Sequence, residues 1–289
     1  IGPSAPSKQL LDAQLISLKH RGPDDSGTYL GPGISLGMGR LAIVEIAAGK
    51  QPVSDASEQI HMVFNGEIYN YRDLRYELEQ SGIHCRTSSE SEVIINLYLK
   101  FGLDFIGKLN GMFAIAIHDA RDNSLHLIRD RMGKKPLWFS QLSDGTLYFA
   151  SEVRALMLAR PDRTLRTDMV AEVMQYGYIN APNSAFNEIS QLLPASLLTW
   201  RDGKTTTSTY WVPDFDTKVK ISYQEALETT KNLIEAAVSR RLISERPIGS
   251  FLSGGYDSTV VTAYMAKLMS EKVQTYSIGF HNAQFNEAH

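Results

Sequence analysis

The stretch Ser253-Gly254-Gly255-Tyr256-Asp257-Ser258-Thr259 decides how the second part of this chain is interpreted. It lies between the apolar runs 248–252 and 260–266, which is the order strand, glycine turn, helix. Adjacent glycines let the backbone approach a ligand, and the N–H groups that open the following helix favour an anion. The three hydroxyl side chains add donors, and Asp257 adds a carboxylate that can hold a divalent metal against phosphates. The pattern predicts a phosphate-binding turn, although an ordinary Ser/Gly turn has the same spacing.

The same stretch resembles the pyrophosphate-binding loop of the ATP pyrophosphatases, whose pattern is Ser-Gly-Gly-x-Asp-Ser/Thr. These enzymes cleave ATP between the α- and β-phosphates to adenylate a substrate. The resemblance implies that the loop holds pyrophosphate and that Asp257 helps to bind Mg²⁺. No Gly-Lys-Ser/Thr ends the loop, so it is not a Walker A motif.

Length, charge and cysteine count limit the classes of protein to which this chain can belong. The chain has 289 residues, enough for two domains or one large one, and a formal charge of −3. That charge predicts no general attraction to nucleic acid or to an anionic membrane, and no apolar run approaches the length of a membrane span. The single cysteine, Cys85, excludes an internal disulfide framework and fits a reducing, cytoplasmic compartment. Because the chain starts at Ile1 rather than at methionine, we expect its start to be trimmed, processed or incomplete.

The first two hundred residues alternate between helical and extended patterns. Leu11, Leu15 and Leu18 predict a helix from Ser7, and the apolar run 112–117 predicts a strand buried on both faces. Further helices are expected at 70–81 and 90–101, and further strands are expected at 34–38, 40–44, 61–64, 125–129, 136–140 and 147–150. The Gly and Pro residues of the stretch 20–27 predict a loop. Buried strands flanked by helices indicate sheets that lie between helical layers.

The expected strand 61–64 runs directly into Asn65-Gly66. A strand that ends in Asn-Gly can aim a side-chain amide and a backbone N–H at one point, which is the composition of an oxyanion hole. A plain Asn-Gly turn has the same sequence, so both interpretations stay open here.

The pattern changes after the polar stretch 201–209, which resembles a linker with a final strand. Ser222 and Glu225 form a capping box that starts a long amphipathic helix. The expected strand 248–252, the helix after it and a strand at 273–278 then give strand-helix-strand, the start of a parallel α/β sheet. We therefore place the boundary near 205–220, with domains 1–210 and 211–289.

Five further motifs occur in the first domain: His20-Arg21-Gly22-Pro23-Asp24, Arg40-Leu41-Ala42-Ile43-Val44, Phe64-Asn65-Gly66-Glu67-Ile68-Tyr69-Asn70, Arg129-Asp130-Arg131-Met132-Gly133-Lys134-Lys135-Pro136-Leu137 and Phe149-Ala150-Ser151-Glu152. They resemble the N-terminal-nucleophile type of glutamine amidotransferase. Together with the phosphate loop, their order resembles the glutamine-hydrolysing asparagine synthetase family over nearly the whole chain. The resemblance implies an α+β fold: an N-terminal-nucleophile αββα sandwich followed by the start of an α/β ATP pyrophosphatase domain with a parallel sheet.

The resemblance also implies the site residues. Arg40 would pair with the carboxylate of glutamine, Asn65 and the Gly66 N–H would stabilise the oxyanion, and Glu67 with Glu90 would meet the amino group of the substrate. The implied glutamine-binding set is Arg40, Leu41, Ile43, Val44, Asn65, Gly66, Glu67 and Glu90. The implied ATP-binding set is Leu252, Ser253, Gly254, Gly255, Asp257, Ser258, Thr259 and Ile278, of which Leu252 and Ile278 match positions that meet adenine and Asp257 is the metal ligand.

Two departures from the family pattern are visible. The family nucleophile is an N-terminal cysteine whose α-amino group serves as base, and no residue of this chain matches it. Cys85 lies mid-chain and is expected to be structural. The sandwich fold that the resemblance implies places its first strand in the middle of a sheet, so we expect roughly ten further residues that form this strand and begin with cysteine. Glu90 stands where the family has aspartate, which moves the charge by about 1.5 Å. The family residues that complete the synthetase site lie beyond His289.

The sequence therefore predicts an ATP-dependent carbon-nitrogen ligase. It would use ATP and Mg²⁺ to adenylate an aspartate-like carboxylic acid and would transfer ammonia from glutamine, giving AMP, pyrophosphate and glutamate. The expected partners are these small molecules, with no nucleic acid and no membrane, and a homodimer is one candidate assembly. One alternative is a relative with an inactive amidotransferase half that uses another amine, as in β-lactam synthetases or lasso-peptide cyclases. The other alternative is a nucleotide-sensing module.

Overall fold

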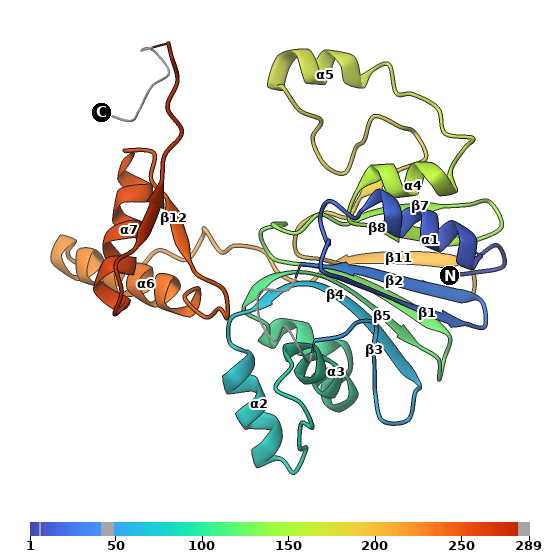
Figure 1. Ribbon diagram of the computed structural model, residues 1–289, viewed down its shortest axis with the longest axis horizontal. Helices are drawn as coiled ribbons and strands as arrows, with labels where there is room; N and C mark the ends of the chain where they lie inside the picture. The colour runs from blue at the N-terminus through green and yellow to red at the C-terminus, as the bar shows by residue number, and fades with distance from the viewer. Residues whose placement is uncertain (6, 42–48, 283–289) are drawn as a thin grey trace. The chain divides into compact units, whose positions relative to one another are not determined.

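The computed structural model describes residues 1–5, 7–41 and 49–282. The chain forms two compact units, Ile1–Pro213 and Asp214–His289 (Figure 1). Each unit has its own sheets and helices, and each is described by itself below.

A six-stranded antiparallel sheet forms the centre of the first unit. Its strands, in order, are β11 (Lys204–Thr209), β10 (Ser196–Arg201), β6 (Ser124–Arg129), β5 (Gly111–Asp119), β4 (Ile60–Ile68) and β3 (Val53–Ser54). From Phe113 to Asp119, every residue of β5 is buried, as the apolar run predicts for a strand covered on both faces.

A second layer of strands faces this sheet. It consists of the hairpin of β1 (Asp25–Gly31) and β2 (Ile34–Arg40), and of a separate group of β8 (Leu147–Ala150), β7 (Trp138–Gln141) and β9 (Ser190–Gln191). A core cluster joins the two layers, with Leu36 of β2, Ala116 of β5 and Leu147 of β8 among its members. The expected loop at 20–27 is therefore wrong from Asp25 onward, because Asp25, Ser26 and Gly27 pair with Arg40, Gly39 and Met38.

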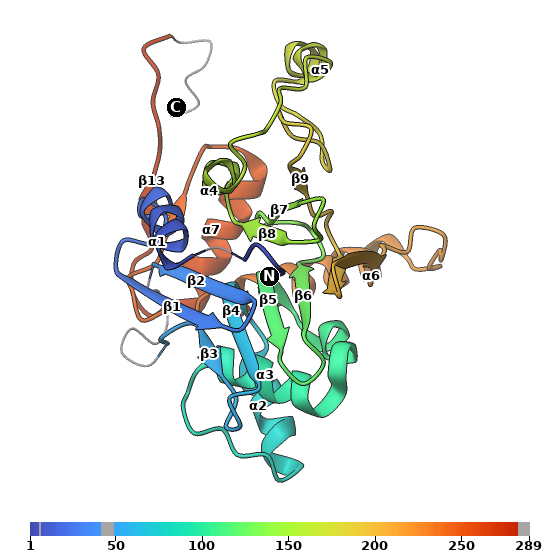
Figure 2. The ribbon, with the colours of Figure 1, turned by 90° about the vertical axis from the view of Figure 1, so that its right-hand side faces the viewer.

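Helices cover the outer faces of the two strand layers (Figures 1 and 2). The helices α2 (Tyr71–Gln80) and α3 (Glu90–Phe101), with the 3₁₀ helix η1 (Gly102–Lys108), share a core cluster with β4 and β5. The helices α1 (Lys8–Ser17) and α4 (Val153–Ala159) contact each other, and they contact β2 and the β7–β8 pair respectively. The αββα sandwich is confirmed. Helix α5 (Met169–Tyr176) has no buried residue.

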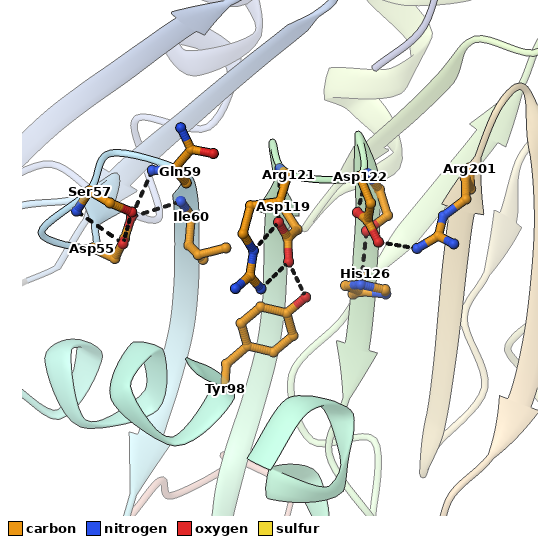
Figure 3. Close-up of polar contacts among 11 residues, drawn as sticks. Asp55, Ser57, Gln59, Ile60, Tyr98, Asp119, Arg121, Asp122, His126 and Arg201 are labelled. Carbon is orange, nitrogen blue, oxygen red and sulfur yellow. Dashed lines mark hydrogen bonds and ion pairs between the residues drawn. The ribbon is translucent and has the colours of Figure 1, made fainter. Parts of the chain in front are cut away.

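Hydrogen bonds tie helix α3 to one end of the central sheet (Figure 3). Asp119, only 3% exposed, accepts from the Tyr98 hydroxyl of α3 at 2.8 Å and from the Arg121 Nε at 2.8 Å. Burial alone would raise the pKa of Asp119, but the hydrogen bonds from Arg121 and Tyr98 outweigh it and hold that pKa below its usual value. Beside it, Asp122 pairs with Arg201 of β10. These contacts fix the end of the sheet opposite to the one described below.

The second unit contains the expected strand-helix-strand. Helix α6 (Tyr223–Arg240) begins with the predicted capping box, in which the Glu225 N–H donates to Ser222 Oγ at 3.2 Å and the Ser222 N–H donates to Glu225 Oε2 at 2.8 Å. Strand β12 (Gly249–Phe251), helix α7 (Tyr256–Leu268) and strand β13 (Gln274–Tyr276) follow. Because β12 and β13 pair in parallel, the predicted parallel sheet is confirmed.

Candidate functional site

A cavity of about 480 Å³ lies in the first unit, lined by residues of both β2 and β8. Within the described residues, β2 pairs only with β1, and β8 pairs only with β7. At the start of β2, the Gly2 N–H donates to the Gly33 carbonyl at 2.9 Å, and Ile1 exchanges two hydrogen bonds with Leu147 of β8. The cavity therefore has strand edges on two sides and runs along β2 from its start toward Arg40.

The expected glutamine-binding residues gather in this cavity from separate elements. Arg40 is the last residue of β2, residues 65–67 lie near the end of β4, and Glu90 is the first residue of α3. All of them line the cavity, as does Leu41. The expected strand at 40–44 is wrong at its start, because β2 ends at Arg40 and Leu41 belongs to no strand. Ile43 and Val44 lie outside the described residues.

The geometry of β4 decides where the Gly66 N–H points. Backbone groups of alternate residues leave a strand on opposite edges. The Tyr69 N–H donates to the Asn110 carbonyl, so odd-numbered residues of β4 direct their groups to β5. Gly66 consequently directs its N–H away from β5, on the edge that also carries the N–H groups of Phe64 and Ile68. The side-chain amide of Asn65 has no hydrogen-bond partner in the described part of the chain.

Gly66 also needs to be glycine. A Cβ at this position would lie 2.7 Å from the Phe113 Cα and closer still to the Met112 carbonyl oxygen of the neighbouring strand. Any side chain would therefore push β4 away from β5. The donor pair of Asn65 and Gly66 thus rests on a close approach of two backbones, which is typical of a site where a backbone N–H meets a ligand.

Charged side chains of both signs meet in the cavity. Burial lowers the pKa of Lys135, while the nearby carboxylate of Glu67 raises it and the guanidinium of Arg21 lowers it. Lys135 is a lining residue that the sequence did not assign to a site, although it stands within one of the quoted motifs. A substrate that carries both an ammonium and a carboxylate group suits such a mixed lining.

The buried carboxylate of Asp130 builds the loop that brings Lys135 to the cavity. It is 1% exposed and accepts hydrogen bonds from four backbone N–H groups, those of Phe113, Met132, Lys134 and Lys135, at 2.9 to 3.2 Å. The neighbouring Arg129 donates to three carbonyl oxygens, including that of Lys135 at 2.9 Å. The Arg-Asp motif is therefore a scaffold for the cavity wall rather than part of its lining.

We expect Asp130→Ala to lower the free energy of unfolding by roughly 3–5 kcal/mol, because it leaves one buried and three partly buried N–H groups without their acceptor. Denaturant unfolding of the purified protein measures this. The matched control is Asp12→Ala, which removes a 2.7 Å exposed pair with Lys8 on helix α1 and should cost less than about 1 kcal/mol. Equal unfolding midpoints for Asp130→Ala and the unmodified protein would contradict the scaffold role.

Two of the quoted motifs meet at the rim of the cavity. Glu152, which precedes α4, accepts from Arg21 Nη1 at 3.4 Å and lies 3.0 Å from His20 Nε2. His20 and Arg21 line the cavity as well. By contrast, Cys85 is half-buried against the α2–α3 core, receives a hydrogen bond from Asn96 at 3.5 Å, and burial raises the pKa of its thiol. This environment fits the structural role expected for Cys85.

The expected phosphate loop joins β12 to α7 in the second unit. Gly254 has φ +88°, which favours glycine, and Gly255 is the N-cap residue of α7. The Ser253 and Ser258 hydroxyls lie 3.1 Å apart across the turn, and Asp257 stands in the first helical turn with its side chain exposed. The turn therefore presents N–H groups, hydroxyls and one carboxylate at a helix start.

The two positions expected near adenine lie beside this loop. The Leu252 N–H donates to the Tyr276 carbonyl at 2.9 Å, and the Ser277 hydroxyl donates to the Leu252 carbonyl at 2.5 Å. Ile278 follows β13 and is 70% exposed. In the described ranges, no group of three or more His, Cys, Asp or Glu side chains could hold a metal ion. A single carboxylate such as Asp257 fits Mg²⁺, which proteins usually hold with one or two carboxylates plus substrate phosphates.

Comparison with known protein families gives two matches. Residues 1–211 match the family described as glutamine amidotransferase domain, and residues 229–289 match the family described as asparagine synthase. Asparagine synthetase [glutamine-hydrolyzing] 1 of Bacillus subtilis is 33% identical over 98% of this chain and 45% of its own length. Asparagine synthetase [glutamine-hydrolyzing] 2 of Arabidopsis thaliana is 32% identical over 92% of this chain and 42% of its own length. The chain thus spans less than half the length of these two relatives.

Solved structures share the fold. The glutamine phosphoribosylpyrophosphate amidotransferase of B. subtilis superimposes with a TM-score of 0.52 at 16% identity, covering 96% of this chain and 65% of its own. A structure described as the allosteric regulatory enzyme of purine biosynthesis gives a TM-score of 0.53 at 16% identity over 95% of this chain and 64% of its own. At this identity, the likeness supports the fold alone. No helix in the described part of the chain is both long and apolar enough to cross a membrane.

Proposed function

The chain belongs to the glutamine amidotransferase domain family and continues into an asparagine synthase segment, and from that premise we propose that the whole protein forms an amide with ammonia taken from glutamine. The observation that carries the proposal is the cavity that gathers Arg40, the pair Asn65-Gly66 and the acids Glu67 and Glu90 from different elements. Each group matches one part of glutamine: its carboxylate, its amide carbonyl and its amino group.

The first half of the reaction is hydrolysis of the glutamine amide. A thiolate attacks the amide carbon, and the carbonyl oxygen becomes an oxyanion that accepts hydrogen bonds from the Asn65 amide and the Gly66 N–H. The carbon-nitrogen bond then breaks, the nitrogen takes a proton and leaves as ammonia, and water hydrolyses the thioester to glutamate. Arg40 holds the substrate carboxylate, so the scissile amide stays beside the donor pair. In this proposal the thiol would belong to the N-terminal cysteine that the family resemblance implies, which no residue of this sequence matches.

The second half is activation of a carboxylic acid in the synthetase domain. The loop at 253–259 binds the pyrophosphate part of ATP with its N–H groups and hydroxyls, as its glycine turn and helix start support. Mg²⁺ held by Asp257 would neutralise the phosphate charge. The acid attacks the α-phosphate, pyrophosphate leaves, and ammonia displaces AMP from the acyl-adenylate. An aspartate-like acid is the proposed substrate, in line with the names of the relatives.

A substitution at Arg40 tests the first half of this proposal. We expect Arg40→Lys in the full-length protein to raise the KM for glutamine by about 10–100-fold, because a point charge does not replace the two-pronged contact with a carboxylate. Steady-state kinetics with glutamine measures this effect. Activity with free ammonia should persist, since that nitrogen source does not use the cavity. Loss of both activities in parallel would contradict the assignment of Arg40 to glutamine.

A further inference from the structure

Among the residues that the structure describes, one edge of β4 has no neighbouring strand beside the proposed oxyanion site. Strand β3 pairs with residues 61 and 62 of β4 and, in the described ranges, with no other residue of that strand. Further along the same edge, Phe64, Gly66 and Ile68 direct their backbone groups away from β5 by the alternation described above. Backbone N–H and C=O groups in a partly buried place need hydrogen-bond partners, so other groups must bond to this edge of β4.

Two side chains bond to this edge of β4 where a neighbouring strand would otherwise pair, one on each side of Gly66. The side-chain amide of Gln51 pairs with Phe64 in both directions: Gln51 Oε1 accepts from the Phe64 N–H at 2.6 Å, and Gln51 Nε2 donates to the Phe64 carbonyl at 2.8 Å. Glu90 Oε2 accepts from the Ile68 N–H at 2.7 Å. The two partners hold the edge at Phe64 and at Ile68, and the Gly66 N–H between them keeps its place beside the cavity.

The segment that carries Gln51 is itself anchored. Two residues after Gln51, strand β3 begins at Val53. A Cβ at Gly27 of β1 would lie 3.0 Å from the Gln51 carbonyl carbon, so the backbone of Gln51 packs closely against β1. A Cβ at Gly49 would lie 2.7 Å from the Cζ of Arg40, so the same segment also rests against the guanidinium in the cavity. Gln51 therefore reaches β4 from a fixed backbone.

We propose that Gln51 is a positioning residue for the oxyanion site: its amide holds Phe64 so that the Asn65 side chain and the Gly66 N–H point at one place. The inference rests on the proposed hydrolysis of glutamine, which it deepens. Oxyanion donors act only when they lie about 2.7–3.1 Å from the developing charge. Without the Gln51 amide, the edge around Gly66 loses its anchor on one side, and a displacement of about 1 Å at a reacting centre can cost about 100-fold in rate.

Kinetics with glutamine test this inference. In the full-length protein, Gln51→Ala should lower kcat for glutamine hydrolysis by about 10–100-fold while the KM for glutamine changes by less than about threefold. The kcat of Gln51→Glu should lie between those of Gln51→Ala and the unmodified protein. Its carboxylate accepts from the Phe64 N–H but cannot donate to the Phe64 carbonyl. Ammonia-dependent synthesis should be unchanged in both. The matched control is Gln59→Ala, an exposed glutamine just before β4 that should leave kcat as it is.

Amide hydrogen exchange gives a readout that does not depend on activity. The Phe64 amide should exchange faster in Gln51→Ala than in the unmodified protein, and it should stay protected in Gln59→Ala. If Gln51→Ala does not fold, Gln51→Glu supplies the same comparison. An unmodified protein without glutaminase activity would contradict the proposed function, and the exchange rates would still decide what Gln51 holds. Equal kcat and equal exchange in the Gln51 variants and an active parent would overturn the inference.

Discussion

Replacing Asp257 by asparagine is expected to reduce ATP–pyrophosphate exchange by the full-length protein by about 100-fold or more. Asp257 supplies the carboxylate of the loop at 253–259, and asparagine keeps its size while removing the charge that would hold Mg²⁺ against the phosphates. The side chain is exposed at the start of α7, so the substitution should leave the fold intact. The measurement is exchange of labelled pyrophosphate into ATP in the presence of the carboxylic acid and Mg²⁺.

Two controls separate this effect from a general loss of function. Glu271→Gln removes another exposed carboxylate of the same unit, away from the loop, and should leave exchange unchanged. Glutamine hydrolysis should continue in Asp257→Asn, because the proposed site for it lies in the first unit. Exchange at the parent rate in Asp257→Asn would rule out the metal role of this residue.

Local patterns predicted much of the fold. The apolar run at 112–117 identified β5, the capping box at Ser222 identified the start of α6, and the glycine loop identified the turn between β12 and α7. The resemblance to glutamine-hydrolysing asparagine synthetases is confirmed by matches that together span most of the chain. These features could be predicted from the sequence because each depends on residues that are close together in the chain.

The elements that were missed depend on contacts between distant residues. Strand β1 starts in a stretch rich in Gly, Pro and Asp, and it forms because it pairs with β2. Asn70 is the residue before helix α2, but its side chain does not cap that helix: it donates to the Lys108 carbonyl and accepts from the Asn110 N–H. In both places a tertiary partner outweighed the local preference.

In the candidate site, too, residues within sequence motifs were predicted and residues placed by contacts with distant segments were not. Arg40, Asn65 and Glu90 were predicted from motifs, and the structure places them around one cavity, while their roles remain proposals. Gln51 was not predicted, because nothing in its sequence neighbourhood shows that its amide will pair with Phe64 of another segment. Glu90 is similar: its bond to the Ile68 N–H shows a carboxylate that also supports the strand edge. Side chains that replace a strand partner leave no periodic signal in the sequence.

The cavity also bears on the expected first strand. Its two sides are the edges of β2 and β8, and the Ile1–Gly2 backbone already bonds to Leu147 on one side and Gly33 on the other. Strand β2 has seven residues from Ile34 to Arg40. An extended segment rises about 3.3 Å per residue. Roughly six residues that precede Ile1 and run antiparallel to β2 would therefore reach Arg40. A segment of about ten residues, as expected from the sequence, is long enough to place its first residue beside Asn65 and Gly66.

In the proposed hydrolysis the attacking thiol belongs to an N-terminal cysteine, and we expect Cys→Ala at that position of the full-length protein to abolish glutamine hydrolysis. The thiol is the group that attacks the amide, and its removal leaves Arg40 and Asn65 able to bind glutamine but unable to cleave it. Ammonia-dependent synthesis should persist, because it bypasses the thiol. Intact mass and N-terminal sequencing of the expressed protein identify the first residue before the variant is made. A mature protein that starts at Ile1, or that has no cysteine ahead of it, would contradict the glutaminase half of the proposal and leave the adenylating half standing.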